Sequence, residues 1–252
     1  MNYKKELEKT LRSMTGTHSI RVVFFDFVEV SAYALSNNFD LEQFDKREEQ
    51  YMKIISKYPR DIGEKFGECL ALLVLALDRD IADILGELYM NLEIHDKGWG
   101  QFFTPTGVSR LAAELVFDKK SMDKAIAEKG YVSLIEPCVG GGAHVIAFAE
   151  VMRKHGYNYQ TQLKVYCNDI DSKVLMLCYV QLSILGIDAI CVNENALTLE
   201  KKEIWFTPFY MLNRMKEQSI NENITAVEKT KEVRKVISEN TDPSMIEQLS
   251  LF

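Results

Sequence analysis

The sequence lacks any apolar stretch long enough to span a membrane, and its N-terminus, MNYKKELEKTLRSM, is too charged for a signal peptide. Its five cysteines include no C-x-x-C pair, and its four histidines show no metal-ligand spacing. We therefore expect a cytoplasmic protein with buried, reduced thiols and with neither a metal site nor a membrane partner.

The chain also has fewer basic residues than acidic ones. The chain carries 30 lysines and arginines against 37 aspartates and glutamates, which gives a formal net charge of −7. A protein with this net charge does not bind DNA through general electrostatic attraction to the phosphates. DNA can still be a substrate if a partner helps to bind it. With 47% hydrophobic and 27% charged residues, the composition is otherwise that of an ordinary globular chain.

Both ends of the chain differ in character from its middle. In LEQFDKREEQYMKIISKY, and in the segment after Pro59, apolar residues recur at helical spacing, so we predict a helical N-terminal domain over residues 1–98. Residues 216–252 are polar and mixed in charge. We predict a solvated C-terminal arm there, with a helix near 224–239.

Residues 99–215 alternate between strand and helix patterns. YVSLI, LKVYCN and DAICVN predict strands, whereas AHVIAFAEVMRKHG and DSKVLMLCYVQLSILG predict helices that are closed by Gly156 and Gly186. A βαβαβ order favours a parallel sheet with right-handed crossovers. The expected fold class is α/β, in which a helical N-terminal domain precedes a partial Rossmann-like domain with a mostly parallel sheet.

The stretch LIEPCVGGGAHV joins the first predicted strand to the first helix of this unit. An acid ends the strand, and three consecutive glycines, Gly140, Gly141 and Gly142, follow. Glycines let a backbone approach a ligand closely, and a helix N-terminus offers N–H groups to it. Asp169, after the second strand, stands where an acid can hold two ribose hydroxyls. The stretch lacks the G-x-G-x-x-G fingerprint, so taken alone it also fits a tight turn without a ligand.

The neighbouring segments favour a ligand. DILGELYMNLEIHDKGWGQFFTP, IEPCVGGGA, NDID and NENAL occur in this order. Over roughly residues 75–200 the chain thereby resembles the N6-adenine DNA methyltransferases of the modification-subunit type in type I restriction systems. The resemblance implies S-adenosylmethionine (SAM) as the cofactor and DNA as the methyl acceptor. It also implies a helical domain in front of the SAM-dependent methyltransferase domain.

The resemblance implies contacts at each end of SAM. Four residues would line the pocket around its methionine end: Gln101, Phe103, Thr104 and Pro105. Glu136 would face the ammonium group. Three residues would shape the loop beneath the carboxylate and ribose: Cys138, Gly140 and Gly142. Asp169 would accept hydrogen bonds from the ribose, Ile170 would pack on the adenine, and Asn195 would lie near the adenine amino group.

The chain departs from the family pattern at several of these positions. Glu136 stands in place of an aspartate, Val139 and Gly141 replace a cysteine and a serine or threonine, and Glu194 replaces a glycine. These changes imply a remodelled pocket.

The family's catalytic N-P-P-[YF] motif is absent. In the family, an asparagine oxygen and a prolyl carbonyl accept both N–H bonds of a flipped adenine, and an aromatic ring stacks on the base. The nearest match is TPFY, which makes Thr207, Pro208, Phe209 and Tyr210 the candidate catalytic residues. The alternative is that EIWFTPFYML forms a fourth strand or an aromatic packing segment.

The last residues form a separate motif, QLSLF: Gln248, Leu249, Ser250, Leu251 and Phe252. It resembles the peptide with which bacterial polymerases and repair proteins bind the replication sliding clamp, a peptide-in-groove contact. A clamp tether would raise the local concentration of an acidic protein on DNA. The alternative is a terminal segment that packs on the protein's own core.

Two functions therefore stand beside each other. The first is the SAM-binding half of a DNA adenine-N6 methyltransferase with a degenerate catalytic motif, completed by a partner subunit or a dimer mate. The expected sheet lacks about three strands, and a target-recognition region is missing as well. The second is an inactive binding or regulatory protein of methyltransferase fold that is recruited to the sliding clamp. Methylation of RNA or protein has no motif in its favour.

Overall fold

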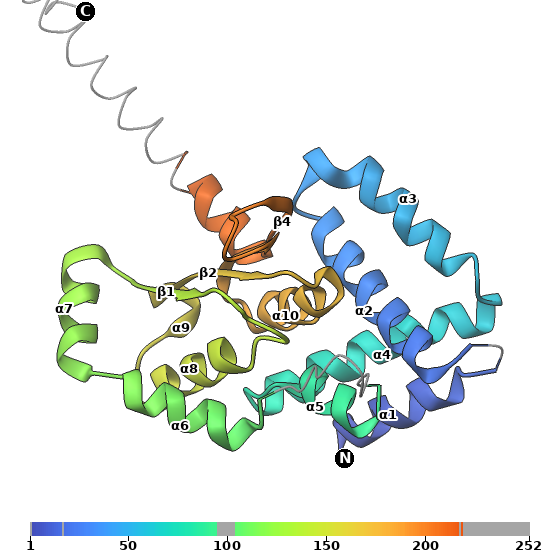
Figure 1. The fold of residues 1–252 in the computed structure, drawn as a ribbon, viewed down its shortest axis with the longest axis horizontal. Coiled ribbons are helices and arrows are strands. Elements are labelled where there is room, and N and C mark those ends of the chain that lie inside the picture. Colours follow the sequence, from blue (N-terminus) through green and yellow to red (C-terminus); the bar gives the residue numbers. More distant parts are fainter. Residues whose placement is uncertain (1, 17, 95–103, 217, 219–252) are drawn as a thin grey trace, which may run out of the picture. The chain divides into compact units, whose positions relative to one another are not determined.

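The computed structural model describes residues 2–16, 18–94, 104–216 and 218 (Figure 1). Residues 1–211 form one compact unit and residues 212–252 a second, of which 212–216 and 218 are described and are helical. The predicted domain boundary at residue 98, the predicted arm from residue 219 onward and the QLSLF motif lie outside the described residues. Among the helices that are described, none has both the length and the apolar character needed to cross a bilayer.

The N-terminal part is helical, as its periodicity predicts. Its elements are α1 Tyr3–Ser13, α2 Ile20–Asn37, the 3₁₀ turn η1 Leu41–Gln43, α3 Phe44–Ile55, α4 Arg60–Arg79 and α5 Ile84–Asn91. Local signals set several boundaries. The side chain of Ser19 accepts a hydrogen bond from Val22 N–H and begins α2, while Asp83 does the same for Gly86 N–H in α5. Pro59 precedes α4 directly.

The rest of the described chain forms a four-stranded sheet together with the helices that connect and flank its strands. Its elements are α6 Thr106–Val116, α7 Lys119–Lys129, β1 Val132–Glu136, α8 Ala143–Lys154, α9 Tyr159–Gln162, β2 Leu163–Asp169, α10 Ser172–Leu185, β3 Asp188–Glu194 and β4 Lys201–Phe206. The strand order is β1-β2-β3-β4, with β1, β2 and β3 parallel and β4 antiparallel to β3. The predicted α/β fold class with a mostly parallel sheet is confirmed. The left-handed Gly186 ends α10, as its sequence predicts.

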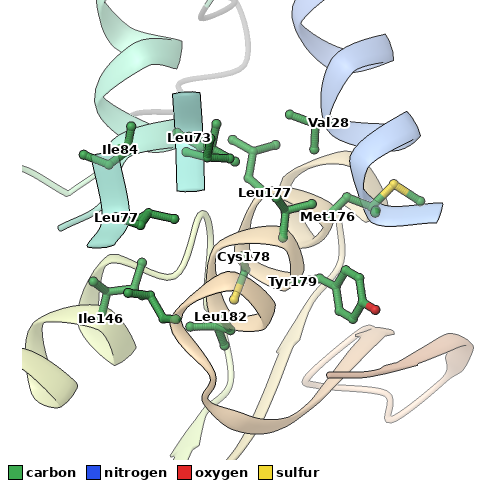
Figure 2. Packing of buried hydrophobic residues seen from close by; sticks show 14 of the residues in the cluster. Val28, Leu73, Leu77, Ile84, Ile146, Met176, Leu177, Cys178, Tyr179 and Leu182 are labelled. Atoms are coloured by element: carbon green, nitrogen blue, oxygen red, sulfur yellow. The ribbon is translucent and has the colours of Figure 1, made fainter. Parts of the chain in front are cut away.

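Helix α10 joins the helical part to the sheet. It contacts β2 and β3 on one side and α2, α4 and α5 on the other (Figure 1). Figure 2 shows Leu177 of α10 near Val28 of α2 and Leu73 of α4, within one buried cluster. A helix buried all round needs apolar residues on every face, and α10 has them. The N-terminal helices therefore share a core with the sheet that carries the Gly-rich loop.

Candidate cofactor-binding site

The Gly-rich loop lies at the carboxyl end of β1 and leads into α8. Two of its glycines have left-handed backbones, Gly140 with φ 57° and Gly142 with φ 97°. A Cβ atom at Gly142 would also lie 3.2 Å from Sγ of Cys178. Glycine is therefore required at position 142 by the turn itself, before any ligand is considered.

Asp169 holds this loop from the neighbouring strand. Its Oδ2 accepts a hydrogen bond from Gly140 N–H at 2.9 Å, and its Oδ1 accepts one from Asp171 N–H at 2.9 Å. The structure thus brings together the loop and the acid that the sequence predicted at the ends of β1 and β2. A carboxylate has about four lone-pair directions, so Asp169 retains acceptor capacity for ligand hydroxyls. Ile170, next to it, is 62% exposed and offers an apolar surface.

Glu136 ends β1 beside the first turn of α8. Its carboxylate lies 3.5 Å from Nδ1 of His144, and it also accepts a long hydrogen bond, 3.4 Å, from Cys138 N–H. Cys138 is exposed. The predicted loop residues therefore do surround the carboxyl end of β1. His144 was not expected from the sequence, although its place in the first turn of α8 follows from the predicted helix.

The carboxyl end of β3 is organised by asparagines. Asn195 uses its Oδ1 to accept hydrogen bonds from Leu197 N–H at 2.9 Å and Thr198 N–H at 3.3 Å, which caps the turn after β3. Asn193 was missed by sequence reasoning. Its Nδ2 donates to the carbonyl oxygens of Asp169 and Ile170 at 3.0 and 2.9 Å and fixes the turn that presents them.

Of the four residues expected around the methionine end, Gln101 and Phe103 lie outside the described residues. Thr104 and Pro105 line a pocket of about 500 Å³ whose wall also contains Asp83 and Glu87. Asp83 is buried, and this burial raises its pKa to about 6 despite hydrogen bonds from Gln181 and Gly86. Because Gln181 also contacts the Gly-rich loop, the pocket and the loop are connected through one side chain.

The predicted catalytic segment lies elsewhere. β4 runs antiparallel to β3, and Phe206 pairs with Ile190 near the beginning of β3. Thr207 is fully buried; its hydroxyl donates to the carbonyl oxygen of Ile187 at 2.7 Å and accepts from Ala189 N–H at 2.9 Å. The Gly-rich loop is at the opposite, carboxyl end of the parallel strands: Thr207 bonds Ala189, whereas Asp169, which holds the loop, pairs with Asn193 about 13 Å further along β3.

This placement argues against a catalytic role for Thr207, Pro208, Phe209 and Tyr210, and it agrees with the alternative of a fourth strand followed by a packed segment. The rings of Phe206 and Tyr210 stack on each other with centroids 4.9 Å apart. The short connection between β3 and β4 was the sequence signal that could have revealed the antiparallel position of β4. Residues 195–200 are too few for a crossover to a parallel position, which takes a dozen residues or more, but suffice for an antiparallel neighbour.

Residues 81–226, more than half of the chain, match the family model described as N-6 DNA Methylase. The chain belongs to the N-6 DNA methylase family. This confirms the resemblance drawn from the four ordered segments. No curated protein matched the sequence. The roles of individual residues toward SAM are not tested by the family assignment and stay predictions.

Two solved structures are similar to this N-6 DNA methylase family member. One is a Listeria monocytogenes protein described as a class I S-adenosylmethionine-dependent methyltransferase, with 13% identity and a TM-score of 0.46 over 77% of this chain and 54% of that chain. The other is the methyltransferase subunit of a type I restriction-modification system from Streptococcus thermophilus, with 12% identity and a TM-score of 0.36 over 73% and 55%. The chain spans about half the length of these solved relatives.

Proposed function

We propose that this chain binds SAM at the Gly-rich loop and is the cofactor-binding half of a DNA adenine-N6 methyltransferase. The observation that carries the proposal is the contact between Asp169 and Gly140, which joins the acid of β2 to the loop of β1 at one edge of the sheet. In open α/β sheets, ligands bind outside the carboxyl ends of the strands. When bound there, SAM would supply an electrophilic methyl group.

The residues around this edge suit the parts of the cofactor. Asp169 would accept hydrogen bonds from ribose hydroxyls, and the exposed Ile170 would cover one face of the adenine. Glu136 would attract the ammonium group, because its carboxylate ends β1 next to the loop. Thr104 and Pro105, with Gln101 and Phe103 before them in the chain, would bound the methionine end. Asn195 would lie near the adenine through its turn after β3.

In this proposal the methyl acceptor is bound by residues that this sequence does not contain. The N-P-P-[YF] motif is absent from the sequence, and the TPFY segment lies at the other end of the sheet. Within the described residues β1 pairs with β2 alone, and Ile135 of β1 is 71% exposed. In doubly wound sheets the next strand lies at this free edge of the first one. We infer that a partner chain supplies that strand, the adenine-binding motif and most contacts with DNA.

Calorimetric titration with SAM tests the cofactor site. The wild-type protein should bind saturably, and D169A should bind about 10- to 100-fold more weakly, because a charged acceptor is lost. D118A is the matched control, since Asp118 is exposed and caps α7. Gly142 is unsuitable as a probe because any side chain there strains the turn. A folded wild type that does not bind SAM, or unchanged affinity in D169A, would overturn the proposal.

Labelled methyl transfer to unmethylated DNA tests the need for a partner. The isolated chain should transfer no label, whereas it should still bind SAM in the calorimeter. Methyl transfer by the isolated chain would contradict the need for a partner and return the search for the catalytic residues to this sequence.

A second candidate function rests on the QLSLF motif. We propose that Gln248, Leu249, Ser250, Leu251 and Phe252 bind a hydrophobic groove of the bacterial sliding clamp. This would recruit the protein to replicating DNA whether or not it takes part in methyl transfer. A pull-down with purified clamp should retain the full chain and lose a variant without residues 248–252. Equal retention of both would end the idea.

A further inference from the structure

Three cysteine sulfurs lie together beneath the Gly-rich loop. Cys167 of β2 and Cys191 of β3 are register partners on neighbouring parallel strands, and their Sγ atoms are 3.5 Å apart. Cys178 of α10 completes the group, so that all three Sγ atoms lie within 4.8 Å of one another. Each of these residues is fully buried. Figure 2 shows Cys178 on the part of α10 that also carries Leu182 and Tyr179 in the buried cluster.

We propose that Cys167, Cys178 and Cys191 form a binding site for one trivalent thiophilic ion, such as arsenic(III). The spacing of the sulfurs fits such an ion. At a metal–sulfur bond length of about 2.3 Å, a planar three-sulfur site holds its sulfurs about 4.0 Å apart, and a pyramidal site holds them closer. The three sulfurs therefore need to move by less than about 1 Å.

The apolar surroundings select the charge of the ion. Three thiolates around a monovalent or divalent cation would leave net negative charge in the core, which is costly to bury. Three thiolates on a trivalent ion form a neutral group. Zinc would in addition require a fourth ligand, and among the described residues the cluster contains only the three cysteines.

The binding step balances without an oxidant or a reductant. Arsenous acid is small and neutral, and it carries three hydroxyl groups on arsenic. Each thiol forms one As–S bond while one As–O bond breaks, and the thiol proton leaves with the hydroxide as water. Three thiols therefore release three waters, and arsenic stays trivalent.

An ion at this site would lie directly under the turn that opens α8. Sγ of Cys178 is the atom nearest to the point where a side chain at Gly142 would begin, at 3.2 Å. We expect occupancy of the cluster to change SAM affinity. That linkage rests on the proposed function, whereas binding of the ion itself does not.

The experiment is a titration of the reduced, full-length protein with arsenite, followed by native mass spectrometry and by As–S absorption. We expect one arsenic per chain, with the loss of three hydrogens from the protein. C167S, C178S and C191S should each bind at least about 100-fold more weakly, because losing a ligand costs more than the 10- to 100-fold typical of outer contacts. C69S, whose cysteine lies outside the cluster, should bind as the wild type does.

A measurement on the wild type alone guards against variants that fail to fold. Arsenite should raise the thermal midpoint of the native protein, and the protein unfolded in urea should bind it far more weakly. No binding by the native protein would overturn the site and leave the cysteines as apolar core residues. Equal affinity of native and unfolded protein, or retained binding in C178S, would overturn it too.

Discussion

Nε2 of Gln181 donates a hydrogen bond to Oδ1 of Asp83 at 2.8 Å, across the boundary between α10 and α5. The same nitrogen donates to the carbonyl oxygen of Gly141 at 2.9 Å, and Oε1 accepts from Leu85 N–H at 2.9 Å. Gln181 is fully buried. One amide therefore fixes the Gly-rich loop relative to the N-terminal helices.

Replacing Gln181 with leucine should destabilise the fold by about 3 kcal/mol, because it removes three buried hydrogen bonds at about 1 kcal/mol each. Q160L is the matched control, since Gln160 Nε2 donates one hydrogen bond, to Leu185 O at 3.0 Å. Urea unfolding measures both, and hydrogen exchange should show faster exchange of the loop amides in Q181L. If Q181L and Q160L lose the same free energy of unfolding, Gln181 does not bridge the loop and the N-terminal helices.

The buried Asp83 should make stability depend on pH. Burial raises its pKa from 3.8 to about 6, so the folded state favours the protonated form. This contribution is fully present below about pH 4 and is lost as the pH rises through about 6, with a size of about 3 kcal/mol. Urea unfolding of wild type and D83N across this window should show the difference, because asparagine does not titrate.

D118N serves as the control for that pH series. Hydrogen bonds from Ser121 lower the pKa of Asp118, so its contribution has the opposite sign and is lost as the pH falls. A constant difference between wild type and D83N from about pH 4 to about pH 7 would show that Asp83 does not titrate in this window.

Thr207 should matter for stability and not for the cofactor. T207V removes a buried hydroxyl that bonds Ile187 and Ala189, and it should cost about 1–3 kcal/mol. T207S keeps the hydroxyl and should lose less. Both should bind SAM with wild-type affinity in the calorimeter. If T207V has unchanged stability but does not bind SAM, the TPFY segment belongs to the cofactor site after all.

Arg47 should be among the most sensitive residues of the N-terminal part. It is buried, pairs with Asp40 at 2.7 Å, donates to Ile204 O at 3.0 Å and lies over the Trp205 ring at 4.0 Å. R47M should cost about 3–5 kcal/mol, because it leaves the carboxylate of Asp40 buried and unpaired.

The double variant R47M/D40N tests that reason, since it removes the orphaned charge and should recover part of the lost stability. R60M is the exposed control: Arg60 pairs with Glu64 on the surface at 3.1 Å, and its loss should cost less than about 1 kcal/mol. If R47M/D40N is no more stable than R47M in urea unfolding, the cost arises from lost packing on Trp205.

Much of the sheet and its helices could be predicted because the signals are local. The apolar strands β1, β2 and β3, the helices α8 and α10, and the glycine that ends α10 each depend on residues a few positions apart. The meeting of Gly140 and Asp169 was also predictable, since the ends of adjacent parallel strands lie at one edge. Residues outside the described ranges, such as Gln101 and Phe252, stay at the level of sequence motifs.

The sequence by itself determined the family, the alternation of strands and helices, and the acids and glycines at the edge of the sheet. Only the tertiary structure decided that β4 turns back beside β3, which carries Thr207 away from the loop. Only it gathered Cys167, Cys178 and Cys191 around one point, and placed Gln181 between two distant segments. The reason is that periodicity and capping act along the chain, whereas strand register and helix packing bring together residues whose spacing in sequence carries no signal.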